Sequence, residues 1–263
     1  MMILIKIIFL LSILPLSAIA HTGLNPDNDL SKGRVILTVA TTEAGYYPFN
    51  YRENGERKGL SVDVLNYFEA NSNYDFEFVT LPWPRALYLV AHGKVDLILT
   101  LFKTSKRKNI YHFIEPAYGY EVNQLFTLVD NKLEFNGQLK QLTPYSIGTI
   151  REYSYGENFD QANHLNKFTA LTENNLVKLL LAGRVDAIVG NPLILNEIIS
   201  KKKVEYKIRA IEPYIAVTPV HIALAKGREN SQEIEQTLGQ LTQQLKASPY
   251  YKKLMNKYQI TSK

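Results

Sequence analysis

Two kinds of hydrophobic pattern alternate along the chain. Residues 35–41, 76–80 and 95–101 are short runs rich in β-branched and aromatic side chains, which predict buried strands. Residues 60–70 and 83–92 instead place their apolar side chains at helical spacing. The alternation of strands with helices indicates an α/β protein in which helices pack on the faces of a sheet.

Individual residues predict where the helices begin. Ser61 is a candidate cap for the first helix, and Pro84 falls in the first turn of the second, where its missing N–H costs no hydrogen bond. Asn230, with an acidic residue three positions on, is a candidate cap for a helix that is apolar on one face. Ser248 and Pro249 predict the start of a last helix, as cap and first residue.

One segment of the chain is repeated. Residues 91–98 (AHGKVDLI) resemble residues 181–188 (LAGRVDAI), and in both an amphipathic helix ends at a glycine before an apolar strand. Glycine suits the left-handed conformation that ends many helices. Gly93 and Gly183 are 90 residues apart, which is too long for a solenoid repeat and fits two similar lobes. A chance similarity of two helix–strand junctions is the alternative.

Two long extended stretches lie where the chain would cross between such lobes. Residues 120–129 end at a polar turn, and residues 215–225 are interrupted by Pro219. The helices predicted after these stretches would return the chain to the first lobe.

The N-terminus has the three-part layout of a secretory signal peptide. Lys6 precedes an apolar run at 7–14, and small residues at 17–20 (SAIA) stand at the positions that a signal peptidase reads. The run is too short for a stable membrane span, although an N-terminal anchor is the alternative. We expect the mature protein to begin near His21, in the periplasm.

The composition excludes several kinds of chemistry. The chain has no cysteine, so disulfides, thiolate zinc sites, cysteine nucleophiles and a lipoprotein anchor are ruled out. With 46% hydrophobic and 21% charged residues, it has the composition of an ordinary globular protein. The net charge of +5 is mild, and no basic stripe interleaves with aromatics, so we do not expect nucleic acid as a partner.

Three groups of motifs follow one another in a recognisable order. They are 43–49 (EAGYYPF) with 59–63 (GLSVD), then 93–96 (GKVD) with 104–107 (TSKR) and 113–118 (FIEPAY), then 147–156 (IGTIREYSYG) before the repeated Gly-Arg-Val-Asp. In this order and spacing the chain resembles the family 3 extracellular solute-binding proteins, the polar amino-acid-binding components of ABC-type importers. The resemblance spans nearly all of the chain after residue 20.

The resemblance implies the type II periplasmic-binding-protein fold. In that fold two α/β lobes, each a mixed sheet flanked by helices, are joined by two crossing hinge strands. We place the signal peptide at 1–20, lobe 1 at 21–125 and 219–263, and lobe 2 at 126–218.

The resemblance also assigns Arg107 to the ligand. This residue matches the family arginine that grips a ligand carboxylate, and a guanidinium does so with two parallel charge-assisted hydrogen bonds. The neighbouring Lys103, Lys106 and Lys108 are expected to be solvated.

A second group of candidates follows a strand of lobe 2. Tyr153, Ser154 and Tyr155 are expected to open a helix, whose free N–H groups and dipole favour an anion. The family uses hydroxyl residues at this turn to hold the carboxylate, and an ordinary helix cap is the alternative for Ser154. Glu152 stands where the family usually has glycine, so we expect an extra carboxylate at the rim of the cleft.

Aromatic and small polar residues complete the predicted site. Tyr46 is at the family's stacking position, and Trp83 and Phe102 are further candidate walls, with a place in the core as the alternative for both. Thr100 stands where the family offers small polar residues, in a segment one residue shorter than usual.

Asn191 is the main departure from the family pattern. Relatives that bind α-amino acids usually carry an aspartate there to pair with the ammonium. Either Glu43 or Glu152 replaces that charge here, or the ligand is not an α-amino acid.

These features predict a monomeric periplasmic protein that closes two lobes on a small, amino-acid-like ligand and delivers it to a membrane ABC permease. We expect no metal ion, no cofactor and no catalytic residue. Two alternatives use the same fold: a cyclohexadienyl or arogenate dehydratase with Glu43 or Glu152 as its acid–base group, and a ligand-sensing input to a receptor kinase.

Overall fold

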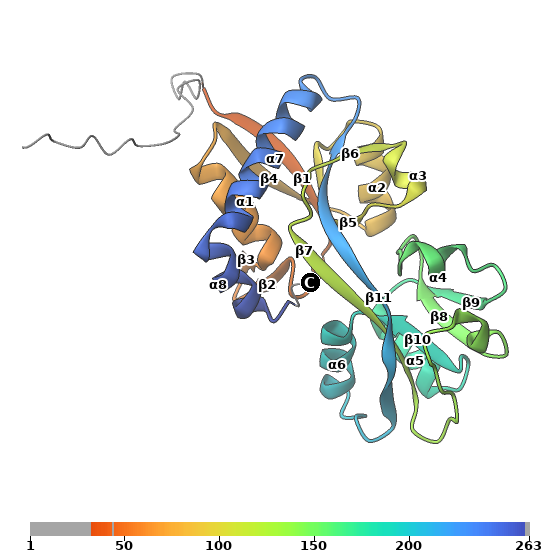
Figure 1. Ribbon diagram of the computed structural model, residues 1–263. Coiled ribbons are helices and arrows are strands. Elements are labelled where there is room, and N and C mark those ends of the chain that lie inside the picture. The colour runs from red at the N-terminus through yellow and green to blue at the C-terminus, as the bar shows by residue number, and fades with distance from the viewer. Residues whose placement is uncertain (1–32, 44, 261–263) are drawn as a thin grey trace, which may run out of the picture.

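The predicted strands and helices assemble into two lobes, seen in a computed structural model that describes residues 33–43 and 45–260 (Figure 1). The predicted signal peptide at 1–20 lies outside the described residues. No helix among the described residues is long and apolar enough to cross a membrane.

Lobe 1 is built on a mixed sheet in which β1 lies parallel between β4 and β5. Helices cover this sheet, and a small hairpin of β2 and β3 lies beside it (Figure 1). Its strands are β1 (Val35–Thr41), β2 (Tyr51–Glu53), β3 (Glu56–Lys58), β4 (Tyr74–Thr80), β5 (Leu97–Phe102) and β6 (Tyr111–Phe113). Its helices are α1 (Leu60–Ala70), α2 (Trp83–Ala91), α3 (Ser105–Lys108), α7 (Ser231–Ala247) and α8 (Pro249–Tyr258).

Lobe 2 repeats the plan on a smaller scale. Strand β8 is parallel to both β9 and β10. Its elements are the 3₁₀ turn η1 (Leu139–Leu142), β8 (Ser146–Ile150), α4 (Glu157–Gln161), β9 (Asn166–Ala170), α5 (Glu173–Leu181), β10 (Ala187–Gly190) and α6 (Pro192–Lys201).

Two long strands join the lobes. β7 (Gly119–Leu128) and β11 (Ile208–Ala225) pair antiparallel and run from one lobe into the other (Figure 1), as predicted for the crossing hinge. β11 begins well before the predicted residue 215. Residues 208–211 already pair with β7, the pairing is interrupted between Ile211 and Ala216, and it then resumes. The predicted lobe boundaries, 125/126 and 218/219, fall within these two strands.

Each lobe has its own hydrophobic core. In lobe 1, Leu37 of β1, Phe68 of α1 and Leu238 of α7 are all fully buried in one cluster. In lobe 2, the consecutive β7 residues Leu125 and Phe126 belong to two different clusters, since neighbouring side chains of a strand point to opposite faces. Full burial of each such side chain contributes roughly 1.5–3 kcal/mol.

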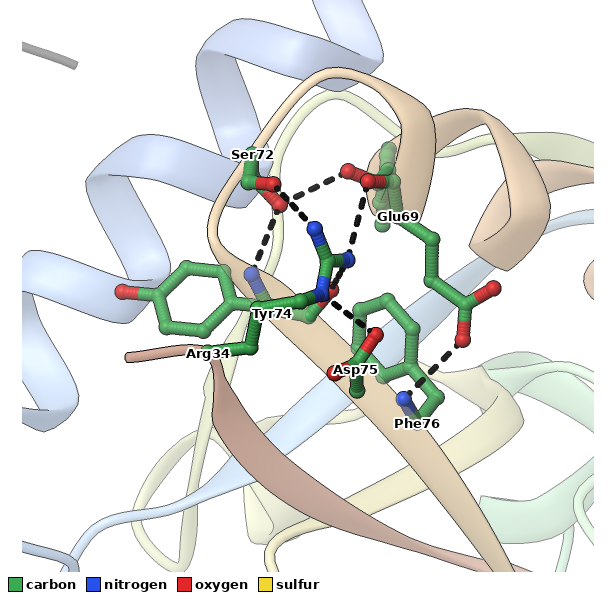
Figure 2. Close-up of polar contacts among 7 residues, drawn as sticks. Arg34, Glu69, Ser72, Tyr74, Asp75 and Phe76 are labelled. Carbon is green, nitrogen blue, oxygen red and sulfur yellow. Dashed lines mark hydrogen bonds and ion pairs between the residues drawn. The ribbon is translucent and has the colours of Figure 1, made fainter. Parts of the chain in front are cut away.

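Arg34 fixes the first described residues to lobe 1 (Figure 2). Its guanidinium donates to the carbonyls of Glu69, at the end of α1, and Tyr74, at the start of β4, at 3.0 and 2.6 Å. It also pairs with Asp75 at 2.7 Å. Since the ion pair is exposed and such pairs contribute little, the main effect is to satisfy free carbonyls at the helix end.

The repeated segment forms the same junction in both lobes, which confirms the prediction of two similar lobes. Gly93 and Gly183 adopt φ of 63° and 64° at the ends of α2 and α5. The aspartate of each repeat then accepts two hydrogen bonds from one residue of a neighbouring strand: Asp96 from the N–H and hydroxyl of Thr38, and Asp186 from those of Ser146. All four distances are 2.6–2.8 Å.

Two predicted helix caps are wrong, and one is confirmed. α1 starts after Gly59 with no side-chain cap, while Ser61 lies buried inside the helix. Asn230 does precede α7, but its backbone is left-handed and its side chain caps nothing. Ser248 caps α8 as predicted, accepting a hydrogen bond from the N–H of Tyr251. Ser61 bonds to the distant Tyr118 instead of capping the helix, and Asn230 adopts a backbone conformation in which its side chain makes no cap hydrogen bond.

We expect Gly183→Ala to lower the free energy of unfolding by about 1–2 kcal/mol, because an L residue is strained at φ 64°. No atom lies within 4 Å of the added Cβ, so the cost is the backbone's alone. Gly227→Ala is the matched control, since it also meets no atom within 4 Å and lies outside the left-handed region. Urea denaturation showing equal stability for the two variants would contradict the assignment.

Candidate ligand-binding site between the lobes

A cavity lies between the two lobes, at one side of the hinge. It encloses about 570 Å³, including the part open to solvent. Most of its wall comes from lobe 1, two residues come from lobe 2, and one comes from hinge strand β7. The lining residues are Ala40, Thr41, Thr42, Tyr46, Asn50, Trp83, Leu99, Thr100, Phe102, Arg107, Glu121, Tyr153 and Ser154.

Seven of the predicted site residues line this cavity, and three do not. Those present are Tyr46, Trp83, Thr100, Phe102, Arg107, Tyr153 and Ser154. Phe102 both lines the cavity and packs in the core of lobe 1. Glu43, Tyr155 and Asn191 are absent from the lining.

Arg107 brings a half-buried positive charge to the cavity. α3 positions it, and its guanidinium donates to the carbonyls of Phe102 at 3.3 Å and Glu152 at 3.0 Å. Burial lowers the pKa of the guanidinium from its usual value, although an arginine remains charged. Within residues 33–43 and 45–260 no carboxylate forms an ion pair with it, so its charge is open to an anion. The neighbouring Lys106 and Lys108 are exposed, as predicted.

Glu152 contributes its backbone to the cleft. Its carbonyl accepts hydrogen bonds from the Trp83 indole at 3.2 Å and from Arg107, both on lobe 1. It adopts φ 63°, a conformation that glycine takes without strain, which explains the glycine usual in relatives. The side chain is exposed. The predicted extra carboxylate therefore points to solvent, and the carbonyl makes the contact between the lobes.

The predicted anion site at residues 153–155 is filled by the protein itself. α4 begins at Glu157, so no helix N-terminus lies at Tyr153. The Ser154 hydroxyl donates to Asp160 of α4, and the Tyr155 N–H donates to the same carboxylate at 2.9 Å. The Tyr155 hydroxyl is buried in lobe 2, where it accepts a hydrogen bond from the N–H of Ile150 at 2.7 Å. Tyr155 is thus a core residue, which corrects the prediction.

Asn191 and Glu43 also have positions away from the cavity. Asn191 caps α6, accepting a hydrogen bond from the N–H of Leu193 at 2.9 Å, so the helix end occupies its side chain. Glu43 is exposed to solvent. Neither residue supplies the missing negative charge in this structure.

Thr100 forms a kink in the wall of the cavity. It has φ 56°, which is rare for a β-branched residue, and the pairing of β5 with β11 shifts register beside it. The hydroxyl of Tyr118 holds the kink, accepting a hydrogen bond from the Thr100 N–H at 3.1 Å. The same hydroxyl bonds to Ser61 at 2.7 Å. The shortened segment seen in the sequence is therefore built as a strained turn supported by a buried tyrosine.

The cavity also contains a carboxyl group that the sequence did not single out. Glu121 of β7 is only 4% exposed, and its Oε1 accepts a hydrogen bond from the Tyr46 hydroxyl at 2.6 Å. Burial raises the pKa of Glu121 to about 8, and the nearby charge of Glu173 adds to the effect. The only sequence signal was an acidic residue inside a long extended stretch.

Glu173, at the start of α5, lies beside the Tyr153 hydroxyl on the lobe 2 side. Burial raises its pKa as well. The rings of Tyr46 and Tyr153 meet edge to face between the two acids, with centroids 6.1 Å apart. One end of the site thus holds an arginine and another holds carboxyl groups. Among the described residues no three acidic or histidine side chains are arranged to hold a metal ion.

We expect Tyr118→Phe to lower the free energy of unfolding by about 2 kcal/mol, because it leaves the Thr100 N–H and the Ser61 hydroxyl without their buried partner. Tyr88→Phe is the control, since the Tyr88 side chain is largely exposed on α2. Chemical denaturation of both variants measures the difference. Equal stabilities would show that the hydroxyl does not support the kink.

We expect Glu121→Gln to stabilise the ligand-free protein more at pH 8 than at pH 5. Between the ordinary carboxyl pKa and about 8, folded Glu121 keeps a proton that the unfolded chain releases, so its contribution to stability falls by roughly 1 kcal/mol per pH unit. Glutamine removes this dependence and still accepts the Tyr46 hydrogen bond. Glu212→Gln, an exposed acid on β11, is the control. A pH-independent difference in urea denaturation would contradict the raised pKa.

Known proteins share this architecture along almost the whole chain. Residues 37–261 match the family model of bacterial extracellular solute-binding proteins, family 3. A curated relative is the probable amino-acid-binding protein YxeM of Bacillus subtilis (strain 168), 27% identical over 225 residues, which are 85% of this chain and 83% of that protein.

Solved structures confirm the predicted periplasmic-binding-protein fold. The substrate binding protein of an amino acid ABC transporter matches with a TM-score of 0.69 at 18% identity, covering 85% of this chain and 99% of that one. A histidine kinase sensor domain with similarity to periplasmic binding proteins matches with a TM-score of 0.74 at 17% identity, covering 88% and 99%. The chain belongs to the family 3 bacterial extracellular solute-binding proteins.

Proposed function

We propose that this protein is a periplasmic amino-acid-binding protein that encloses a small ligand between its lobes and delivers it to a membrane ABC permease. The observation that carries the proposal is Arg107, a half-buried cation that lines an inter-lobe cavity and donates only to backbone carbonyls among the described residues. Desolvating an arginine is costly, and a ligand carboxylate with two charge-assisted hydrogen bonds offsets that cost. Export by the signal peptide at 1–20 and a monomeric state belong to the same proposal.

Capture follows from the hinge. Lobe 1 supplies most of the cavity wall, so the ligand docks there first. Lobe 2 then swings about β7 and β11 and adds Tyr153 and Ser154. The contacts of Trp83 and Arg107 with the Glu152 carbonyl hold the lobes together across the cleft. A permease that recognises the surface of both lobes together then distinguishes loaded from empty protein.

One specific observation favours the dehydratase alternative. Glu121 is a carboxylic acid kept protonated near neutral pH inside the cavity, which is the state that a general acid needs. The sensor alternative uses the same closure and differs only in the partner that reads it. Ligand recovered unchanged from the protein supports binding, whereas turnover of a cyclohexadienyl substrate supports the enzyme.

We expect Arg107→Ala to weaken binding of the best amino-acid ligand by about 30-fold or more, because it removes one partner of a buried charge pair. Arg107→Lys keeps the charge but loses the planar fork, so it also binds more weakly. Thermal shift followed by calorimetry on residues 21–263, with amino acids, amines and small carboxylates, measures both. Lys108→Ala, on an exposed neighbour, is the control.

If Arg107→Ala binds the ligand as tightly as the wild type does, the proposed pairing of Arg107 with a ligand carboxylate is wrong. A folded protein that binds none of the compounds would instead favour the enzyme assay and a search for a partner protein.

A further inference from the structure

Hinge strand β7 buries several polar side chains. Gln124 and Thr127 donate hydrogen bonds to carbonyls of lobe 2 and β11, while Glu121 and Asn123 are 4% and 1% exposed. Glu121 and Asn123 are two residues apart, so they lie on the same face of the strand. Of these four residues, Glu121 lines the cavity between the lobes.

Both side chains have unused hydrogen-bonding capacity. Oε1 of Glu121 accepts from Tyr46, and no residue of 33–43 and 45–260 donates to its Oε2. The Asn123 amide nitrogen is buried without any partner among the same residues. Oε2 of Glu121 can therefore accept a hydrogen bond from a donor group of a molecule bound in the cavity, whereas the Asn123 nitrogen can only donate.

Acidic groups from both lobes stand near this face. Glu173 of lobe 2 lies close enough to act on Glu121 and stands beside Tyr153, whose ring meets that of Tyr46. The buried lining offers one guanidinium, Arg107, on α3 of lobe 1. A molecule that fills the cavity therefore meets a cation at one part of its surface and a carboxyl group at another.

From this arrangement we infer that Glu121 is the specificity-determining residue for the positively charged group of the ligand. The inference rests on the proposed function and narrows its ligand class to zwitterions or cationic amino acids. The ligand carboxylate pairs with Arg107, and its ammonium or guanidinium pairs with Glu121. The charge expected from residue 191 is thus supplied by the hinge, because Asn191 is occupied as a helix cap.

The pairing couples ligand binding to a proton. Glu121 holds its proton near neutral pH when the cavity is empty, and a ligand cation favours the ionised form. Binding therefore releases a proton, and affinity rises with pH until Glu121 is already ionised. The titratable groups facing Glu121 are Tyr46, Tyr118, Tyr153, Tyr155 and Glu173. Burial raises the pKa of every one of these tyrosines, so Glu173 is the one other group that can exchange a proton near neutral pH.

The test is calorimetry of the mature protein with L-arginine, L-lysine and L-glutamine, each compared with its analogue lacking the α-amino group (5-guanidinopentanoate for arginine). Glu121→Gln should lower the affinity for the best-binding amino acid by about 30-fold or more. An effect on the amino acid alone assigns Glu121 to the α-ammonium, and an equal effect on the analogue assigns it to the side-chain cation. Glu212→Gln, the exposed hinge acid, should bind as the wild type does.

The wild-type protein supplies a second measurement that does not depend on a variant folding. Titrations at pH 7 in buffers of different ionisation enthalpy should show net proton release, and affinity should rise about tenfold or more between pH 6 and pH 8. Wild-type affinity retained by Glu121→Gln, with no proton release, would overturn this inference and leave the proposed function standing. No binding of any amino acid to the wild type would overturn both.

Discussion

β7 and β11 pair from Gly119 opposite Val220 at one end to Leu128 opposite Ile208 at the other, and both lobes are built outward from this ladder. The sheet of lobe 1 continues from β11, and that of lobe 2 from β7. The break in pairing between Ile211 and Ala216 lies within lobe 2's end of the ladder. Strand geometry thus decides how the lobes are joined and which hinge side chain lines the cavity, namely Glu121.

Much of this fold could be predicted from local sequence. The strand at 35–41 and the helix at 60–70 form with the predicted bounds, because their patterns are long and regular. The repeated Gly-Lys/Arg-Val-Asp segment predicted two similar lobes, and in both lobes its aspartate accepts hydrogen bonds from a residue of a neighbouring strand. Local patterns could not predict which distant residue each polar side chain would hydrogen-bond to. Ser61 has the chemistry of a cap, yet the distant Tyr118 takes its hydroxyl.

The site divides in the same way. The position of Arg107 at the cavity could be predicted because motif order carries information about a shared fold, and its neighbours Lys106 and Lys108 are as solvated as expected. Glu121 could not, since one acidic residue in a strand does not say which face is buried or what packs on it. Tyr155 failed for a related reason. Its hydroxyl is equally suited to a ligand or to the Ile150 N–H, and only the tertiary structure places it in the core.

The indole of Trp83 reaches across the cleft from lobe 1 to the Glu152 carbonyl and meets the Tyr153 ring edge to face at 5.9 Å. It is the chain's single tryptophan. If the lobes separate as proposed, the indole exchanges this hydrogen bond and aromatic neighbour for water, and its emission changes. The protein therefore carries an intrinsic fluorophore at a contact between its lobes, through which the proposed motion can be followed in solution without any label.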